Sequence, residues 1–337
     1  MWRIREGRNV TRIAVDAFGG DYAPEQIVEG ALLAAELEDV SILLTGDEGR
    51  LKPLVSGKAG SNRIEIVHAP EVVEMDDEPV AAVRAKRDSS LVKGAQLVRQ
   101  GEADALVSAG NTGATLAAAL FNIGRIKGVE RPAISTIMPT AAGFSLVLDV
   151  GANADCRPSQ LVQFAHMGSI YASEVLKVHN PRVGLLNVGH EPGKGNQLAK
   201  EVYTLLQDTS LNFVGNVEGR EVPSGNVDVI VCDGFVGNIV LKFAEGLGAT
   251  LLGMIKEEAQ RNLVRTAGAL LMKPGFRQIK KRMDPNEYGG APLLGIDGVV
   301  IIAHGGSNAK AIYNAIRVAR EGVQNNYVQI IAEKMAR

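Results

Sequence analysis

Glycine, asparagine and threonine gather where several short apolar stretches of this chain end. The clearest case follows the apolar stretch 105–107 and precedes the helix-forming stretch 114–121, and it consists of Ser108, Ala109, Gly110, Asn111, Thr112 and Gly113. The two glycines allow a sharp turn and a close backbone approach to a ligand. The asparagine and threonine can cap the following helix, whose free amides and positive dipole end attract an anion. We therefore predict that Ser108 and residues 110–113 bind a phosphate or thioester substrate.

The same arrangement recurs, which favours a binding site over an ordinary connection between a strand and a helix. Further apolar stretches end in polar, glycine-rich turns that contain Asn153, Lys194, Asn238 and His304. Parallel sheets bind ligands outside the carboxyl ends of their strands. The sequence therefore predicts that one edge of a sheet gathers these side chains and residues 108–113. Asn153 and His304 are assigned to substrate binding, although backbone bonds would equally explain the histidine.

Lys194 stands between two glycines, and Asn196 follows them. A nucleotide-binding P-loop has four residues between its glycines and a serine or threonine after the lysine. Here three residues separate Gly189 from Gly193, and a glycine follows the lysine, so an ATP site is not expected. A lysine flanked by glycines can still approach an anion closely. A flexible surface lysine would give the same pattern.

Metal and cofactor chemistry have weaker support. Asp16, Asp149 and Asp233 each end an apolar stretch, and carboxylates of this kind could together hold a divalent cation. Acids at such places more often cap helices, so we expect no metal. No G-x-G-x-x-G sequence follows an early strand, and no dinucleotide cofactor is expected. Ser108 lacks the surrounding pattern of an acyl-serine nucleophile.

Apolar stretches alternate with helical ones along most of the chain, at 12–16, 41–44, 64–67, 105–107, 144–150, 182–187, 227–232 and 298–303. This alternation predicts an α/β fold with a layered, mostly parallel sheet and helices on both faces. We predict a single α/β catalytic domain over residues 11–337. Residues 1–10 lack the apolar core of a secretory signal and are predicted to be a disordered extension.

Residues 239–282 break the alternation, because they are helical without an intervening strand. Two amphipathic helices that project from the sheet as an arm would give this pattern. A helix pair packed on its own domain is an equal alternative. Leu263 and Val264 form an apolar patch near the middle of the segment, and we predict that they contact a membrane.

The 337-residue chain has a formal net charge of −2 and 46% hydrophobic residues, as soluble globular proteins do. No overall basic field attracts nucleic acid, so no such partner is expected. No apolar run reaches the roughly 18 residues that a spanning helix needs. Cys156 and Cys232 form no disulfide framework, which predicts the reducing cytoplasm and two buried thiols.

Taken together and in order, several motifs resemble those of bacterial PlsX-type phosphate acyltransferases. They are Arg12–Pro24, Ser108–Ala114, Asp149–Cys156, Gly193–Asn196, Asp233–Asn238 and Gly289–Gly295. The resemblance extends roughly from Arg12 to the C-terminus. Phe18 stands where the family usually has methionine, and Gly306 where serine is expected, and neither change removes a charged group.

The resemblance implies transfer of a long fatty acyl chain from acyl carrier protein to inorganic phosphate, which gives acyl phosphate for phospholipid synthesis. It also implies a homodimer that associates peripherally with the anionic inner face of the cell membrane. The implied fold is related to phosphotransacetylases and to isocitrate and isopropylmalate dehydrogenases, and no cofactor is implied.

This chemistry suits the residues. Phosphate is already an anionic nucleophile, so the enzyme must mainly hold it beside the thioester and stabilise the oxyanion that forms. Lys194 suits the first task and the amide of Asn238 suits the second. Both are therefore predicted to be catalytic residues.

Acyl carrier protein is acidic, so its docking face should be basic. A ten-residue segment with five cations and no acid contains Lys273, Arg277, Lys280, Lys281 and Arg282. Such a run is usually just a solvated helix face, and only the implied partner makes it the predicted docking site.

Two other functions are compatible with these patterns. One is a metal-dependent dehydrogenase-like enzyme of the same fold, and the other is a non-catalytic protein that binds phosphate or acyl chains. Dependence of activity on a metal would indicate the first. Tight phosphate binding without turnover would indicate the second.

Overall fold

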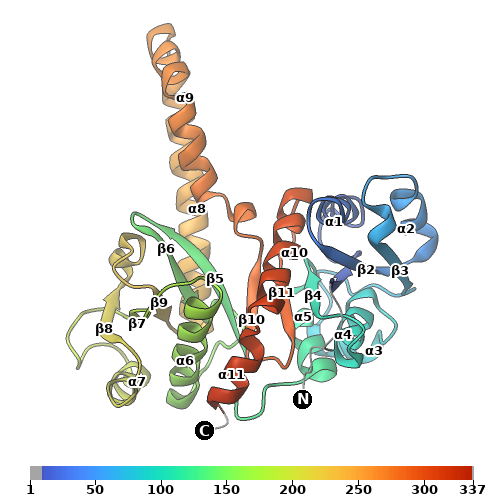
Figure 1. The fold of residues 1–337 in the computed structure, drawn as a ribbon. Helices are drawn as coiled ribbons and strands as arrows, with labels where there is room; N and C mark the ends of the chain where they lie inside the picture. Colours follow the sequence, from blue (N-terminus) through green and yellow to red (C-terminus); the bar gives the residue numbers. More distant parts are fainter. Residues whose placement is uncertain (1–9, 336–337) are drawn as a thin grey trace.

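One sheet of eleven strands runs through the computed structural model, which describes residues 10–335 (Figure 1). Along the chain the strands are β1 Thr11–Asp16, β2 Val40–Gly46, β3 Ile64–His68, β4 Ala105–Ser108, β5 Ala133–Thr140, β6 Gly143–Leu148, β7 Val183–Asn187, β8 Phe213–Glu218, β9 Val229–Val231, β10 Ala291–Leu294 and β11 Val299–Ile302. Their order in space is β3-β2-β1-β4-β11-β10-β5-β6-β9-β7-β8. The predicted layered, mostly parallel α/β fold is confirmed.

Helices cover both faces of this sheet. They are α1 Glu25–Leu37, α2 Glu48–Val55, α3 Pro79–Ala85, α4 Ser90–Gln100, α5 Thr112–Ala118, α6 Pro158–Glu174, α7 Gln197–Gln207, α8 Gly234–Ala259, α9 Leu263–Met283, α10 Ala309–Gln324 and α11 Tyr327–Met335, with short helical turns η1 Ser61–Arg63, η2 Ala119–Ile123, η3 Gly219–Ser224 and η4 Pro285–Glu287. Successive strand residues point to opposite faces. Ile13 and Val15 accordingly belong to a buried cluster with α1, α6 and α10, whereas Ala14 belongs to a second cluster with α4 and α5.

Two antiparallel strands in the middle of the sheet reverse its direction. β10 is antiparallel to both β11 and β5, and β5 is antiparallel to β6. The group from β3 to β11 therefore runs opposite to the group from β6 to β8. β10 pairs with β11 through Ala291 and Pro292 only, and with β5 through Leu293 and Leu294 only.

An arm of two helices, α8 and α9, projects from one side of the molecule (Figure 1). It corresponds to the predicted arm at residues 239–282, although α8 begins at Gly234 and α9 ends at Met283. By length and hydropathy alone α8 would suffice to cross a bilayer, and it is mostly unburied. Both ends of the arm nevertheless return to the sheet, since β9 precedes α8 and β10 follows α9.

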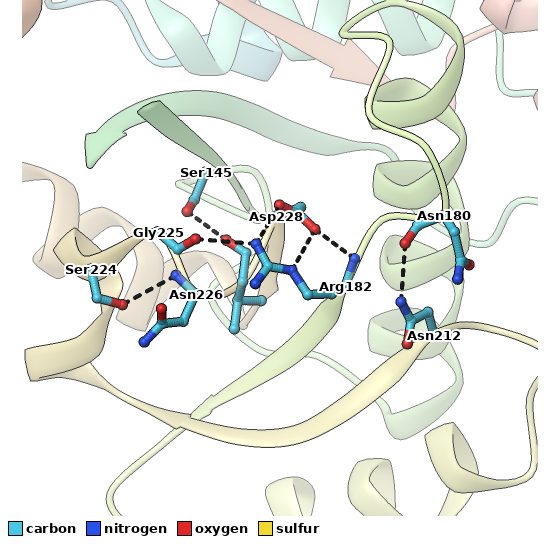
Figure 2. A network of polar contacts seen from close by, with 9 residues as sticks. Ser145, Asn180, Arg182, Asn212, Ser224, Gly225, Asn226 and Asp228 are labelled. Atoms are coloured by element: carbon cyan, nitrogen blue, oxygen red, sulfur yellow. Dashed lines mark hydrogen bonds and ion pairs between the residues drawn. The ribbon is translucent and has the colours of Figure 1, made fainter. Parts of the chain in front are cut away.

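A polar network joins the amino ends of β7 and β9 (Figure 2). Arg182 donates to Asp228 from Nε, from Nη2 and from its backbone amide, at 2.8 to 2.9 Å. Burial alone would raise the pKa of the Asp228 carboxyl, but the hydrogen bonds and charge of Arg182 outweigh it and lower the pKa. The folded state therefore binds this proton less readily than the unfolded chain does.

We expect this pair to stabilise the fold above the carboxyl's unfolded pKa of about 3.9, and to stop doing so as pH falls through the lower folded value. Asp228→Asn should lower the melting temperature at pH 7, since hydrogen bonds to charged groups contribute about 1.5–3 kcal/mol. The difference from wild type should shrink as pH is lowered below 4. Thermal melts between pH 2 and 7 measure this, and a difference that is constant over that range would contradict it.

Candidate active site

The predicted site residues lie at two edges of the sheet, so the expectation of a single edge was wrong. The carboxyl ends of β1, β4 and β11 form one edge, here called the Ser108 edge. The carboxyl ends of β6, β9 and β7 form the opposite edge, here called the Lys194 edge. The antiparallel strands β5 and β10 reverse the strand direction between the two groups. Neither strand was among the apolar stretches on which the prediction rested.

Ser108 is buried at the first edge and bonded within the protein. Its Oγ donates to Asp16 Oδ2 at 2.8 Å and accepts the Gly110 N–H at 3.1 Å. Burial raises the pKa of Asp16, and the hydroxyls of Ser90 and Ser108 oppose the rise. To donate to a substrate anion, the Ser108 hydroxyl would have to give up its bond to Asp16. We therefore revise its role to holding the glycine turn.

Asn111, Thr112 and Gly113 complete the same turn. The Asn111 side chain caps α5, as predicted, and its Nδ2 donates to the backbone oxygens of residues 75 and 77 at 2.9 and 3.2 Å. Thr112 is exposed at the helix start. Gly113 lies so close to Pro79 that a Cβ would stand 2.7 Å from its Cγ. The Asn111 amide is thus occupied, and an anion at this turn would contact backbone amides or Thr112.

His304 is exposed at the same edge, in the turn after β11. Its Nδ1 accepts the Gly306 N–H at 3.0 Å. A neutral ring with this bond carries its proton on Nε2, which leaves one donor for a ligand. The backbone bond and the predicted donor role are therefore compatible.

Asp149 organises the Lys194 edge. Its buried carboxylate accepts N–H bonds of 2.8 to 3.1 Å from the backbones of Ile134, Gly151, Ala152 and Asn153 and from the Asn153 side chain. Burial raises the pKa of this carboxyl, and the hydrogen bonds oppose the rise. Asn153 Nδ2 also donates to the backbone oxygen of Pro132 at 2.8 Å. The Asn153 amide is occupied within the protein, so we revise its predicted substrate contact to a supporting role.

The first turn of α8 is fixed on this loop and presents Asn238. Asp233 caps α8, and the Gly234 N–H donates to the Asn153 carbonyl at 2.7 Å. Gly237 lies so close to the sheet that a Cβ would stand 1.9 Å from the backbone oxygen of Asp149. Asn238 follows and is exposed beside Gly151. Its amide is therefore well placed to face a ligand.

Lys194 lies in the segment 188–196 between β7 and α7, here called the Lys194 loop. Its side chain is exposed, and its stem packs near Gly189. Among the described residues no hydrogen bond or ion pair engages its ammonium group. β9, which leads to Asn238, lies between β6 and β7 in the sheet. Lys194 and Asn238 thus come from the carboxyl ends of neighbouring strands.

The cysteines at this edge are thiols rather than thiolate nucleophiles, and the three acids that end apolar stretches are divided between the two edges. Burial raises the pKa of the half-buried Cys156 thiol to about 12, and burial also raises the pKa of the fully buried Cys232 thiol. Neither is a thiolate nucleophile near neutral pH. Asp16 lies at the opposite edge from Asp149, so these acids cannot share a cation. Within residues 10–335, no three His, Cys, Asp or Glu side chains are grouped to hold a metal.

Two asparagines that the sequence analysis missed hold the Lys194 loop. Asn187 Nδ2 donates to the Lys194 carbonyl at 3.2 Å, and Asn216 Nδ2 donates to the Glu191 carbonyl at 2.9 Å. Asn216 lies in β8, far from the loop along the chain. The stretch that forms β8 was not among the predicted strands, so no sequence signal singled this asparagine out.

The arm carries the remaining predicted residues. Leu263 and Val264 begin α9 at the tip and are 89% and 82% exposed. The side chains of Lys273, Arg277, Lys281 and Arg282 are exposed on α9. Lys280 is in the same helix, but its side chain lies outside the described residues.

Comparison with known proteins agrees with this picture. The family model described as fatty acid synthesis protein matches residues 11–330. Phosphate acyltransferase of Desulfitobacterium hafniense (strain Y51) is 54% identical over 327 residues, which cover 97% of this chain and 98% of the relative. The phosphate acyltransferase of Pelotomaculum thermopropionicum is 53% identical over 320 residues, which cover 95% and 94%.

Solved structures share the fold at low sequence identity. A phosphotransacetylase from Streptococcus pyogenes aligns with a TM-score of 0.65 and 18% identity, and the alignment covers 94% of each chain. A 4-hydroxythreonine-4-phosphate dehydrogenase from Klebsiella pneumoniae aligns with a TM-score of 0.52 and 11% identity over 94% of this chain and 98% of its own. The predicted likeness of the fold to phosphotransacetylases is confirmed, and the fold is also that of a 4-hydroxythreonine-4-phosphate dehydrogenase, whereas the likeness to isocitrate and isopropylmalate dehydrogenases stays a prediction. Because the family model and the relatives match almost the whole chain, the chain belongs to the fatty acid synthesis protein family and, like its phosphate acyltransferase relatives, is an acyltransferase.

Proposed function

We propose that the chain transfers a long-chain fatty acyl group from acyl carrier protein to inorganic phosphate, with its reaction centre at the Lys194 edge. The observation that carries this location is the pair of exposed side chains, Lys194 and Asn238, at the ends of neighbouring strands. The Asp149 and Asn153 side chains beside them are hydrogen-bonded within the protein, whereas Lys194 and Asn238 are free to meet a substrate. The curated relatives named phosphate acyltransferase support the reaction class.

The chemistry follows from these two groups. A phosphate oxygen attacks the thioester carbonyl, a C–O bond forms, and the carbonyl oxygen becomes an oxyanion. The C–S bond then breaks, and the carrier thiolate leaves and takes a proton from water. The Lys194 ammonium neutralises phosphate beside the carbonyl, and the Asn238 amide donates to the oxyanion.

Incubation of the protein with palmitoyl-acyl carrier protein and phosphate tests this proposal. Acyl phosphate should form, trapped as a hydroxamate, together with one free carrier thiol per product. Hydrolysis to free fatty acid without phosphate dependence would contradict it, as would phosphate binding without turnover.

We further propose that the protein is a homodimer on the cytoplasmic face of the membrane. An exposed apolar stripe runs along α8 with four-residue spacing through Phe235, Ile239, Phe243, Leu247 and Leu251. Such a stripe covers one helix face and is typical of a surface that another helix buries. A second copy of the arm supplies a matching stripe. Sedimentation equilibrium that gives the mass of one chain would contradict the dimer.

The arm tip is proposed to enter the headgroup region of the membrane. Arg261 and Arg265 flank the apolar tip, but both contact Glu258 within the protein. Anionic headgroups therefore gain little from these arginines, and Leu263 and Val264 should contribute most of the attachment. Such binding is weak and reversible.

We expect Leu263→Glu/Val264→Glu to lose most co-sedimentation with anionic liposomes, because two carboxylates replace the exposed apolar pair. Salt should weaken wild-type binding only modestly. Leu37→Glu is a matched control, since Leu37 is 65% exposed at the end of α1. Equal binding by the double variant, with its melting temperature unchanged, would place the contact elsewhere.

Carrier docking is proposed on α9. Lys273, Arg277 and Lys281 follow one another at four-residue spacing, so they share one helix face. Lys273→Glu/Lys281→Glu should raise the KM for acyl carrier protein about two- to thirtyfold, given about 0.2–1 kcal/mol for each of two exposed ion pairs. The KM for phosphate should hardly change. Lys58→Glu is the control, because Lys58 lies between α2 and β3, the strand at one end of the sheet. An unchanged KM for acyl carrier protein in the double variant, measured at low salt, would contradict this docking face.

A further inference from the structure

Within the Lys194 loop the Lys194 N–H donates to the Glu191 carbonyl at 3.0 Å, which fixes the backbone of the lysine but not its side chain. Gly193 and Gly195 flank Lys194, and Gly195 has a φ of +90°, where a side chain would be strained. No hydrogen bond or ion pair of the described residues holds the ammonium group itself. The position of Lys194 therefore depends on what holds the backbone of its loop.

Asparagine side chains of the sheet hold this backbone at two points. Asn187, the last residue of β7, donates to the carbonyl of Lys194 at 3.2 Å and accepts the Val188 N–H at 2.8 Å. Asn216 Nδ2 donates to the carbonyls of Glu191 and His190 at 2.9 and 3.4 Å. One asparagine thus secures each half of the loop.

Asn216 holds the loop at the cost of some stability of the fold. It is 5% exposed, and its Oδ1 is buried without a partner among the described residues. Turning the amide over would place Oδ1 against two carbonyl oxygens, so the observed orientation is fixed. A buried acceptor without a partner lowers stability, whereas leucine in this strand would bury no such atom. The Asn216 amide therefore fixes the position of the loop backbone and lowers the stability of the fold.

We propose that Asn216 is a positioning residue for acyl transfer, which acts by holding residues 190 and 191 so that the Lys194 ammonium faces the reacting groups. This inference rests on the proposed role of Lys194. Displacing a catalytic group by about 1 Å can cost about a hundredfold in rate. Loss of the Asn216 bonds should lower kcat about ten- to a hundredfold and leave the KM values within about threefold.

Asn216→Leu removes the donor, and Asn216→Asp keeps the shape but sets a carboxylate against the two carbonyls. Both should lower kcat, the aspartate variant more, while Asn216→Leu should melt no lower than wild type. Asn212→Leu is the matched control. Asn212 precedes the same strand and also donates to one carbonyl, that of Asn180, but at the opposite end (Figure 2). The kcat of the Asn212→Leu variant should equal that of wild type.

A double-mutant cycle decides between positioning and general damage. If Asn216 acts through Lys194, Asn216→Leu should lower the rate of wild type but not that of Lys194→Met. An equal fold-loss in both backgrounds, or no loss of kcat in wild type, would overturn the proposal. If the leucine variant does not fold, Asn216→Asp carries the same cycle. Failure of the unmodified protein to make acyl phosphate would instead refute the proposed function.

Discussion

Lys194→Met is expected to lower kcat/KM for acyl transfer by at least about a hundredfold. Methionine keeps an unbranched apolar side chain of similar length and removes only the charge. That charge neutralises phosphate as its oxygen approaches the carbonyl, and loss of one such group typically costs 10²–10³ in rate, or about 3–4 kcal/mol. Acyl-phosphate formation at saturating phosphate measures the effect.

Lys200→Met provides the matched control for this substitution. Lys200 is exposed on α7, six residues beyond Lys194. It should retain full activity, and both variants should melt with wild type because neither lysine has a described side-chain partner. If Lys194→Met keeps more than about a tenth of the activity, Lys194 is a surface lysine and the assignment fails.

Asn238→Ala is expected to lower kcat about a hundredfold while raising KM much less. The hydrogen bond from a neutral amide becomes stronger as negative charge develops on the carbonyl oxygen. Loss of the amide therefore destabilises the transition state more than the bound substrates. Asn238→Asp keeps the shape but replaces the donor by an anion, and it should be at least as inactive. Steady-state kinetics with both substrates measure the split between kcat and KM.

The kinetics of the Asn238 variants report on catalysis only if the first turn of α8 keeps its structure. Asn238 is exposed, so neither change disturbs the contact of Gly237 with Asp149. The losses from Lys194→Met and Asn238→Ala should combine to less than their sum if both groups serve one charge. A KM effect that exceeds the kcat effect would assign Asn238 to substrate binding.

Local pattern sufficed for much of the fold. Apolar stretches such as 105–107 and 298–303 became buried strands, and Asn111 caps a helix as predicted, because these features depend on neighbouring residues. Strand direction could not be read in this way. β10 contributes only Ala291–Leu294, and its antiparallel pairing depends on strands far away in the chain.

The candidate site was predictable in residue type more than in role. Asn153 and Lys194 both follow an apolar stretch in a glycine-rich turn. The Asn153 amide donates hydrogen bonds to Asp149 and Pro132, whereas the Lys194 ammonium has no partner among the described residues. Burial and partners distinguish them, and both come from tertiary contacts. Asn216 shows the converse, since only the folded loop brings a donor in β8 to the Glu191 carbonyl.

The narrow pairing of β10 has a mechanical consequence. β1 pairs with β2 over six residues, but β10 joins each neighbour over two, and Pro292 has no N–H to add. The line through β10 is therefore where the sheet can bend with the fewest hydrogen bonds strained. A bend there would turn the half that carries Lys194 and Asn238 against the half that carries Ser108 and His304, as two leaves turn about a hinge.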